Sequence, residues 1–535
     1  MSNGTQPPAR LVETLIDRCR ERKWSTKIAD SMGAQLTGCE LLARSLVLRR
    51  LLRRHVLAEG EQYIGVLLPP SVGGVVANTA IALDRRVSVN LNYTSSPAAI
   101  NDCIRQSGVR HVLTSRRFLE KMDLRVDAEM VMLEDFRDRA RWSDKAIGAA
   151  QAYAWPARLL CRSLGTGKTR NDDVLTVIFT SGSTGEAKGV MLTHGNIAHN
   201  VQGVREAIQL TSRDVLLGVL PFFHSFGYTV TLWAVLTIDV KGAYHFNPLD
   251  AKQVGKLCRE NGGTLLLAAP TFLRTYARRC DPEDFRSLEV VVTGAEKLPN
   301  DISEAFESKF GIRPDEGYGT TELSPVVSVN LPARKTQSGI RQGAKVGTVG
   351  RPLREVQARI VDLDTGKVLG PGVPGMLQIK GPNVMKGYLG RDDLTAQVIK
   401  DGWYTTGDVA TIDDEGFIRI TGRESRFSKI GGEMVPHIKI EETLAQAVGM
   451  NDDGAPRVAV TAVPDERKGE RLVVLHTRLD SSPEELCRIL SSAGLPNLYI
   501  PSPESFIEVE RVPILASGKL DLRRIKETAR EKFDL

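Results

Sequence analysis

The sequence has no cysteine cluster and no cysteine pairing pattern. Its cysteines are odd in number and far apart, and the spacing Cys-x-x-Cys does not occur. Neither a disulfide framework nor a structural zinc site is therefore expected, and this usage suits a reducing cytoplasm. The seven cysteines are Cys19, Cys39, Cys103, Cys161, Cys258, Cys280 and Cys487.

The sequence also lacks a long uninterrupted apolar run. Its most apolar stretch, residues 63–83, contains Pro69, Pro70, Gly73 and Gly74 in its middle. These residues favour a strand, a turn and a helix over a membrane span. The N-terminus shows no basic segment followed by an apolar one, so no secretory signal is predicted. We expect a cytoplasmic protein.

A strong excess of one charge is absent as well. The 71 lysines and arginines nearly balance the 65 acidic residues, which leaves a net charge of +6. So small an excess does not require a nucleic-acid partner, and none is expected. A chain of 535 residues, 41% of them hydrophobic, is too long for one ordinary core. We therefore expect two or more domains.

What the sequence does contain is a series of short buried-strand runs with helical segments between them. This alternation predicts α/β layers with largely parallel sheets. After about residue 345 the pattern changes to short strands and tight turns, and residues 409–412 and 417–420 form a predicted hairpin. The buried runs are Tyr63–Leu68, Val112–Thr114, Val174–Thr180, Leu265–Ala268 and Val290–Thr293.

The last hundred or so residues predict a separable unit, in which Ser482-Pro-Glu-Glu485 is a capping box that opens a helix. The predicted fold class is α/β: a large N-terminal domain of layered α/β subdomains plus a β-rich subdomain, with a small mobile α+β C-terminal domain. The predicted boundaries are an N-terminal domain at residues 1–422, a hinge at 423–428 and a C-terminal lid at 429–535.

The most informative local motif lies where the buried run Val174–Thr180 meets a loop of hydroxyls and glycines. Such a loop lets backbone N–H groups converge on phosphate oxygens, and its lysine adds a positive charge. The alternative is a Ser/Gly surface loop with a solvated lysine. The candidate nucleotide ligands in this loop are Thr180, Ser181, Gly182, Ser183, Thr184, Gly185 and Lys188.

Two other patterns carry less weight. Leu164–Thr169 resembles the end of a Walker motif, but Arg162 stands where the first glycine is required. The residues before it also predict a helix or linker rather than a strand. His245 and Asp250 match a His-x4-Asp acyltransferase pattern, which we interpret as accidental in a chain with eight histidines.

Four further clusters contain groups that an adenylating enzyme needs. Residues 316–322 combine an aromatic ring that can stack on a purine with a carboxylate that can hold Mg²⁺ between phosphates. Asp408 could accept both ribose hydroxyls, and Arg423 could add a guanidinium near the same sugar. Lys519 follows a glycine close to the C-terminus. Taken singly, each cluster is as well explained by a plain loop or a surface charge.

Together, in this order and approximate spacing, the motifs resemble the acyl-adenylate-forming ligases, which include acyl-CoA synthetases, peptide-synthetase adenylation domains and beetle luciferases. The resemblance extends from about residue 40 to the end of the chain. The family's phosphate loop, Tyr-Gly-x-Thr-Glu, Thr-Gly-Asp, Gly-Arg and Gly-Lys-x-Asp motifs appear as Phe179–Gly189, Tyr318–Glu322, Thr406–Asp408, Gly422–Arg423 and Gly518–Asp521.

The resemblance implies two half-reactions: a carboxylate and ATP form acyl-AMP and pyrophosphate, and a thiol then takes the acyl group. It implies that Lys519 bridges the carboxylate and the α-phosphate, that Glu322 holds Mg²⁺ and that His224 lines the pocket. Tyr318 would pack on the adenine, and Asp408 would fix the ribose. The remaining implied nucleotide contacts are Gly319, Thr320, Thr321 and Arg423. The implied acyl pocket also includes Phe223, Gly227, Thr271, Gly294 and Ala295. The implied hinge and thioester face consist of Arg426, Lys429, Gly431 and Gly432.

A narrower resemblance is to the ligase half of bacterial acyl-[acyl-carrier-protein] synthetase/2-acylglycerophosphoethanolamine acyltransferase. It implies a fatty acid substrate, ATP and Mg²⁺ as cofactors, and coenzyme A or the phosphopantetheine of acyl carrier protein as acceptor. Because we expect no acyltransferase half before about residue 40, the chain would not esterify a lysolipid. The segments that carry this resemblance are Asn92–Thr94, Leu113–Leu119, Leu220–Gly227, Val292–Leu298 and Lys429–Val435.

Other functions stay open at this point. An aryl or small-acid CoA ligase of the same fold is one alternative. A catalytically inactive lipid-binding homologue is another, and the presence of every side chain that the chemistry needs argues against it. Residues 44–54 could form a basic amphipathic helix that contacts the inner face of the membrane peripherally. We favour the more common case, in which such a helix packs on its own domain with its arginines solvated.

Overall fold

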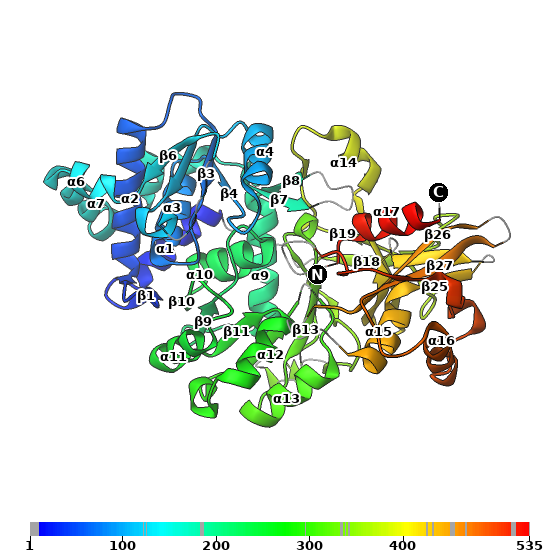
Figure 1. Cartoon of the computed structure of the whole chain (residues 1–535). Coiled ribbons are helices and arrows are strands. Elements are labelled where there is room, and N and C mark those ends of the chain that lie inside the picture. The colour runs from blue at the N-terminus through cyan, green and yellow to red at the C-terminus, as the bar shows by residue number, and fades with distance from the viewer. Residues whose placement is uncertain are drawn as a thin grey trace, which may run out of the picture.

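The computed structural model describes residues 10–120, 122, 124, 126–181, 187–294, 296–331, 335–336, 339–340, 343–423, 426–430, 433–449, 455–465, 468–514 and 520–533. A large N-terminal domain occupies most of the view in Figure 1, and a smaller C-terminal domain lies beside it at the right. The predicted division into a large mixed α/β part and a small C-terminal part is therefore confirmed.

One mixed sheet of the N-terminal domain has the order β17–β14–β13–β12–β11–β9–β10–β1–β2. Its strands from β13 to β1 run parallel, and antiparallel strands close both edges. The bounds are β1 Thr26–Asp30, β2 Gln35–Thr37, β9 Val215–Gly218, β10 Lys241–Tyr244, β11 Leu265–Ala268, β12 Val290–Thr293, β13 Asp315–Gly319, β14 Val326–Val329 and β17 Arg351–Pro352.

A second sheet of this domain has the order β20–β8–β7–β4–β3–β5–β6. Its inner strands are parallel, and β8 returns antiparallel to β7. The bounds are β3 Tyr63–Val66, β4 Val87–Asn90, β5 His111–Thr114, β6 Glu129–Met132, β7 Val174–Ser181, β8 Ala187–Thr193 and β20 Gly387–Tyr388. The five buried runs predicted from the sequence correspond to β3, β5, β7, β11 and β12 and are confirmed.

The β-rich part that follows residue 350 is a sheet in the order β18–β19–β22–β21, with β23 paired to β22. The predicted hairpin is confirmed as β22 and β23, joined by the turn at residues 413–416. The bounds are β18 Gln357–Val361, β19 Gly375–Lys380, β21 Ile399–Lys400, β22 Trp403–Ile412 and β23 Ile418–Arg423; a separate short hairpin is formed by β15 Lys335–Thr336 and β16 Gly339–Ile340.

The C-terminal domain is a sheet in the order β25–β24–β27–β26, with β28 parallel to β27 and helices packed on it. The Ser482 hydroxyl accepts a hydrogen bond from the Glu485 backbone at 3.3 Å, so the predicted helix start and the Ser482 half of the predicted capping box are confirmed. The bounds are β24 Phe427–Ile430, β25 Glu433–Pro436, β26 Val458–Asp465, β27 Gly469–His476, β28 Phe506–Glu508, α15 His437–Val448, α16 Pro483–Ser492 and α17 Leu522–Lys532.

Helices cover the N-terminal sheets, as their apolar faces require. Within the described ranges, no helix is both long enough and apolar enough to cross a membrane. The helices are α1 Leu11–Glu21, α2 Gly38–His55, α3 Val72–Leu83, α4 Pro97–Ser107, α5 Arg116–Leu119, α6 Asp135–Arg139, α7 Trp142–Tyr153, α8 Ala157–Leu164, α9 His194–Ile208, α10 Ala234–Thr237, α11 Ala251–Asn261, α12 Pro270–Arg279, α13 Asn300–Phe310 and α14 Asp392–Val398.

The basic helix α2 packs against α3 and α7 of its own domain, as expected. Its arginines, however, are not simply solvated. Four of them form ion pairs with two aspartates, Asp84 and Asp144, whose side chains are 5% and 2% exposed. This contact explains why a helix with so many like charges is tolerated here. The pairs are Arg49–Asp84, Arg53–Asp84, Arg50–Asp144 and Arg54–Asp144.

The Walker-like segment belongs to a helix end, as the missing glycine suggested. Helix α8 ends at Leu164, and Gly165 adopts φ +70° as its C-cap. Residues Thr166–Lys168 then form a short 3₁₀ turn. No strand leads into this segment, because α8 precedes it directly, so it lacks the architecture of a phosphate loop.

Candidate active site

A buried carboxylate, Asp408, lies at the centre of the candidate site. It is 2% exposed and stands on β22 directly opposite Arg423 of β23. Its Oδ1 accepts from Arg423 Nε at 2.8 Å, and its Oδ2 accepts from the Tyr318 hydroxyl at 2.5 Å. Three residues that the sequence analysis proposed as nucleotide contacts are thus brought together, two from the β22–β23 hairpin and Tyr318 from β13, 90 residues before Asp408.

The Tyr318 phenol is held in its neutral form. Burial, followed by the negative charge of Asp408, raises the pKa of Tyr318 well above its ordinary value, so the phenol stays a donor. The Arg423 side chain is 63% exposed, which leaves most of its guanidinium available to a ligand. The arrangement presents an acidic acceptor flanked by a ring and a cation, and these are groups that suit a nucleoside.

A second cluster links the proposed metal ligand to the lysine of the phosphate loop. Glu322 Oε1 accepts from the Tyr388 hydroxyl at 2.9 Å. The Lys188 ammonium lies over the Tyr388 ring, 5.4 Å from its centroid. Tyr388 therefore separates the carboxylate from the ammonium, and the two groups do not neutralise each other through a direct ion pair.

The predicted phosphate loop connects the two strands of a β-hairpin. Strand β7 ends at Ser181, strand β8 begins at Ala187, and Thr180 pairs with Lys188 across the hairpin. Lys188 is therefore fixed by strand pairing at the base of the loop. The predicted ligands Gly182, Ser183, Thr184 and Gly185 lie outside the described residues, as does the side chain of Ser181.

The donor set near Glu322 fits a magnesium ion that is shared with phosphates. Among the described residues, no group of three or more His, Cys, Asp or Glu side chains could hold a metal ion by itself. Mg²⁺ characteristically binds through one or two carboxylates and completes its shell with water and substrate phosphates. Glu322 suits that role, because only its Oε1 is used by Tyr388.

The residues proposed for the acyl pocket have unequal environments. His224 is exposed, so it is not a core histidine, whereas Phe223 is 4% exposed and packs edge-on against Tyr93 at 4.8 Å. Gly227 begins the buried π-helix η2 (Gly227–Trp233), and a Cβ there would lie 2.1 Å from the Pro221 carbonyl oxygen. Only glycine fits such a close approach.

Other contacts connect the residues proposed for the acyl pocket to those proposed for the nucleotide. Ser225 Oγ donates to Thr321 Oγ1 at 3.2 Å, which connects the His224 loop to the 318–322 motif. A Cβ placed on Gly294 would lie 3.5 Å from the Phe226 ring. Thr271 is exposed in the first turn of α12. Ala295 lies outside the described residues.

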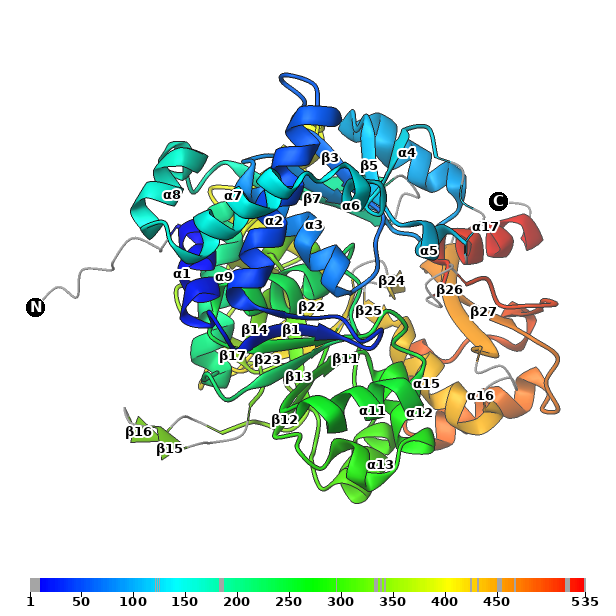
Figure 2. The same ribbon diagram turned by 90° about the vertical axis from the view of Figure 1, so that its left-hand side faces the viewer.

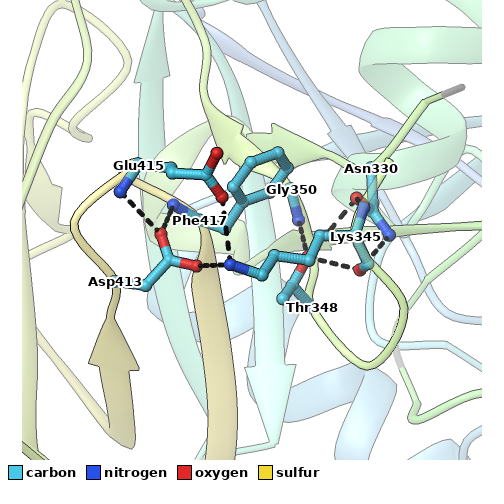
Figure 3. Close-up of polar contacts among 7 residues, drawn as sticks. All are labelled: Asn330, Lys345, Thr348, Gly350, Asp413, Glu415 and Phe417. Atoms are coloured by element: carbon cyan, nitrogen blue, oxygen red, sulfur yellow. Dashed lines mark hydrogen bonds and ion pairs between the residues drawn. The ribbon is translucent and has the colours of Figure 1, made fainter. Parts of the chain in front are cut away.

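A polar clamp fixes the hairpin that carries Asp408 and Arg423 (Figure 3). Lys345 Nζ pairs with Asp413 at 2.5 Å and with Glu415 at 3.1 Å, both in the turn between β22 and β23. The Asn330 side chain in turn holds the Lys345 backbone with two hydrogen bonds of 3.0 Å. The turn of one sheet is thereby fastened to the end of β14 in another.

The residue proposed as the pivot, Arg426, lies within the C-terminal domain. It is 6% exposed, forms an ion pair with Glu441 of α15 and donates to the Val460 carbonyl of β26. Of the predicted hinge, residue 423 thus belongs to β23 and residues 427–428 belong to β24. Lys429 is in β24, and its side chain, Gly431, Gly432 and Lys519 lie outside the described residues.

Two tyrosines near the site were not singled out from the sequence. Tyr388 lies 66 residues from Glu322 in a segment with no local motif, so only the fold reveals it. Tyr404, which is 4% exposed, had a signal: it lies four residues before Asp408 in the same strand, β22. Burial and the charge of Glu322 raise the pKa of Tyr404 well above its ordinary value.

Comparison with known proteins supports the interpretation of these motifs as those of an adenylate-forming enzyme. The family model described as "AMP-binding enzyme" matches residues 17–389. A long-chain-fatty-acid–CoA ligase of Salmonella typhimurium is 26% identical over 542 residues, which cover 95% of this chain and 94% of that protein. A feruloyl-CoA synthase of an Amycolatopsis species is 31% identical over 369 residues, which cover 68% of this chain and 70% of that protein.

A solved structure shares the fold. The o-succinylbenzoate coenzyme A synthetase of Bacillus subtilis, in complex with ATP and magnesium ion, superimposes with a TM-score of 0.78 at 23% identity. The match covers 96% of this chain and 99% of that one. The predicted fold class, a large N-terminal domain of layered α/β and β-rich parts with a small C-terminal domain, is confirmed by this likeness.

Proposed function

Since the chain belongs to the AMP-binding enzyme family, we propose that it is an ATP- and Mg²⁺-dependent acid–thiol ligase that activates a long-chain fatty acid. The first half-reaction joins the carboxylate to the α-phosphate of ATP and releases pyrophosphate. In the second, a thiol takes the acyl group from acyl-AMP. We propose coenzyme A or the phosphopantetheine of acyl carrier protein as that thiol.

The observation that carries the proposal is the assembly of Tyr318, Asp408 and Arg423 into one hydrogen-bonded cluster. An inactive homologue would have no need to keep a buried carboxylate with an aromatic ring and a cation beside it. Burying a carboxylate costs free energy unless it is paired and hydrogen-bonded, and here Arg423 and Tyr318 supply those partners.

Each site residue has a separate role in adenylation. Asp408 accepts the ribose hydroxyls, while the Tyr318 ring packs on the adenine. Lys188, at the base of the β7–β8 hairpin, places its positive charge next to the β- and γ-phosphates. Two anions must meet for the reaction to occur, so fixed positive groups lower its barrier. Glu322 would hold Mg²⁺, which supplies further screening of the phosphate charge when bound.

The C-terminal domain contributes to both half-reactions in this proposal. Lys519 bridges the acid and the α-phosphate during adenylation. Rotation of the domain then withdraws Lys519 and brings the face that includes Lys429, Gly431 and Gly432 to the thiol. We place the pivot between Arg423 and Arg426, because each of these residues contacts its own domain.

Two observations support a fatty acid over an amino acid. The pocket residues Phe223, Gly227 and Gly294 offer no anchor for an ammonium group. A relative that covers 95% of this chain is named a long-chain-fatty-acid–CoA ligase. An aryl acid is the second candidate, because the feruloyl-CoA synthase is 31% identical over its match.

The test is acid-dependent pyrophosphate release from ATP and Mg²⁺. Palmitate, ferulate and benzoate are each supplied without acceptor, with coenzyme A and with phosphopantetheinylated carrier protein. We expect turnover with palmitate and one acceptor, and little with the aryl acids. Asp408→Asn serves as the matched variant with an impaired nucleotide site.

Turnover with ferulate or benzoate alone would replace the fatty acid with an aryl acid in this proposal. Binding of ATP without pyrophosphate release, under every combination of acid and acceptor, would contradict the proposed activity and favour the inactive homologue.

A further inference from the structure

Helix α7 exposes an apolar stripe to solvent, which is unusual for a surface helix. Trp142 is 81% exposed, and Ala146, Ala149 and Ala150 are exposed as well. With 3.6 residues per turn, these positions and Tyr153 lie along one side of the helix. The exposed apolar residues therefore form one continuous stripe along the helix.

The opposite side of α7 is fully used. Asp144, Gly148 and Ala152 are buried against α2. A Cβ added at Gly148 would lie 2.6 Å from the Val47 side chain, so the two helices are in close contact. The exposed stripe is consequently not a core face that has been turned outward, because the helix already has a packed face.

Neighbouring elements extend the same surface. Trp24, in the segment between α1 and β1, is 76% exposed and packs against Tyr153 with ring centroids 5.1 Å apart. On α8, Leu159 is 48% exposed. We call this set the α7–α8 surface; its members are Trp24, Trp142, Ala146, Ala149, Ala150 and Leu159.

The segment that carries α7 and α8 is basic. Residues 139–170 contain one acidic residue, Asp144, and it is buried. Exposed acidic residues flank the segment at Asp138, Asp172 and Asp173. Lys145, Arg158 and Arg162 are exposed, and in the described part of the chain no ion pair engages them. The basic residues of the segment are Arg139, Arg141, Lys145, Arg158, Arg162, Lys168 and Arg170.

The surface also lies where contact with a large partner would not obstruct the candidate active site. In Figure 1 helix α7 is at the edge of the N-terminal domain opposite the C-terminal domain, and Figure 2 shows α7 and α8 on the side away from the C-terminal domain. A partner bound there leaves the C-terminal domain free to move.

We propose that the α7–α8 surface docks the protein on an anionic lipid bilayer. An exposed tryptophan on an apolar helix face, with a second exposed tryptophan in a neighbouring loop and with lysine and arginine nearby, has the composition of segments that lie at the boundary between lipid headgroups and acyl chains. Each basic side chain near an anionic leaflet adds electrostatic attraction. This surface is distinct from the α2 arginines, which are engaged by Asp84 and Asp144.

The same charges disfavour a second copy of the chain as the occupant. A two-fold interface would place this surface against itself, so that its basic residues would face one another. Like charges at close range oppose association unless anions lie between them. A lipid surface supplies such anions as a continuous layer. The inference does not depend on which acid the enzyme activates.

The experiment is co-sedimentation of the full chain with phosphatidylglycerol vesicles and with phosphatidylcholine vesicles. We expect binding to the anionic vesicles that weakens as salt is added. Trp24→Ser/Trp142→Ser should lower the partition coefficient at least about tenfold. Lys145→Gln/Arg158→Gln/Arg162→Gln should lower it roughly 100-fold at low salt.

Matched controls carry the same kinds of substitution elsewhere. Leu249→Ser/Val368→Ser removes two large apolar side chains that are 53% and 62% exposed. Lys252→Gln/Lys367→Gln/Lys400→Gln removes three exposed charges. Both controls should bind vesicles as the wild type does. All variants should retain the far-UV circular dichroism of the wild type and its adenylate formation.

A second measurement does not rely on variants that alter binding. Brominated phosphatidylglycerol should quench the tryptophan fluorescence of the wild type, and Trp142→Phe should remove a large part of that quenching. Equal vesicle binding by the wild type and the surface variants, or no binding by the wild type, would overturn the proposal. So would a wild-type dimer that Trp24→Ser/Trp142→Ser converts to a monomer without vesicles.

Discussion

Asp408 shows how one side chain can be prepared for a ligand before the ligand arrives. Its two oxygens have different protein partners, a neutral phenol on one side and a guanidinium on the other. Each partner is a donor that a ribose hydroxyl can share or displace at small cost. The two donors thus orient the carboxylate in a buried position.

Replacing Asp408 with asparagine should weaken the nucleotide site selectively. The Tyr318 hydroxyl can still donate to the amide oxygen, but the ion pair with Arg423 and the charged acceptor for the ribose are lost. Because hydrogen bonds to charged groups contribute about 1.5–3 kcal/mol, we expect the KM for ATP to rise roughly 10- to 100-fold. Steady-state kinetics with varied ATP measure this change.

Asp414→Asn is the matched control, since Asp414 is exposed in the turn of the same hairpin. It should leave the KM for ATP unchanged. An Asp408→Asn enzyme with a normal KM for ATP would remove Asp408 from the nucleotide site.

Two buried histidines should make stability depend on pH. Burial, with the charges of Arg426 and Lys526, lowers the pKa of His437 to about 3, and burial lowers the pKa of His194 to about 4. Both regain an ordinary pKa of 6.5 on unfolding. Below pH 6.5 the unfolded chain therefore binds more protons than the folded one, and the free energy of unfolding falls as the pH falls.

The free energy of unfolding should fall by up to about 1.4 kcal/mol per pH unit for each histidine. Above the pKa of the unfolded chain it should no longer depend on these histidines. Urea unfolding at about pH 7.5 and about pH 5 measures it. His437→Gln, which keeps a donor towards Ser428, should lose less stability between the two pH values than the wild type. An identical loss in both proteins would contradict the role of His437.

At the scale of elements, the clamp of Lys345 on the β22–β23 turn determines how firmly Asp408 and Arg423 are held. The side chains of Lys345, Asp413 and Glu415 are all partly exposed, so their ion pairs contribute little to stability. The ion pairs instead fix the position of the hairpin, because they anchor its turn while its other end carries the proposed nucleotide contacts Asp408 and Arg423.

Lys345→Met should therefore alter binding more than overall stability. We expect the KM for ATP to rise by up to about fivefold, with kcat changed by less than about twofold. Lys367→Met, an exposed lysine of the same β-rich part, is the control. An unchanged KM with a lowered unfolding temperature would assign Lys345 a purely structural role.

The sequence predicted the elements well where a strong local pattern acts alone. The run Val174–Ser181 is apolar and β-branched, so its strand follows from composition, and Ser482 caps its helix through contacts within four residues. It could not predict that the arginines of α2 would pair with Asp84 and Asp144, which approach from other elements. Tyr388 escaped notice for the same reason: its role depends on tertiary proximity to Glu322.

At the scale of the whole molecule, the two half-reactions should be separable through Lys519. Lys519→Ala should abolish adenylate formation from acid and ATP, because the bridge between two anions is removed. It should leave thiolysis of supplied acyl-AMP largely intact. Single-turnover assays of each half-reaction measure the two effects. Equal loss of both would refute the proposed role of Lys519.

The family resemblance extended to the whole architecture because the motifs are distributed along the entire chain. The acid and the acceptor thiol are harder to infer, since apolar pockets for aliphatic and aromatic acids use similar small and aromatic residues. Phe223 illustrates the difficulty: it belongs to a motif of the pocket, yet its ring is buried against Tyr93.

The connection between the two domains is very short. Only Glu424 and Ser425 separate Arg423, which is bound to Asp408, from Arg426, which is bound to Glu441. Three Cα–Cα steps reach at most about 11 Å. A C-terminal domain on so short a tether can turn but cannot move away, so its groups stay near the candidate site at a high and nearly constant effective concentration. In the proposed mechanism, which half-reaction proceeds is then a question of orientation rather than of encounter.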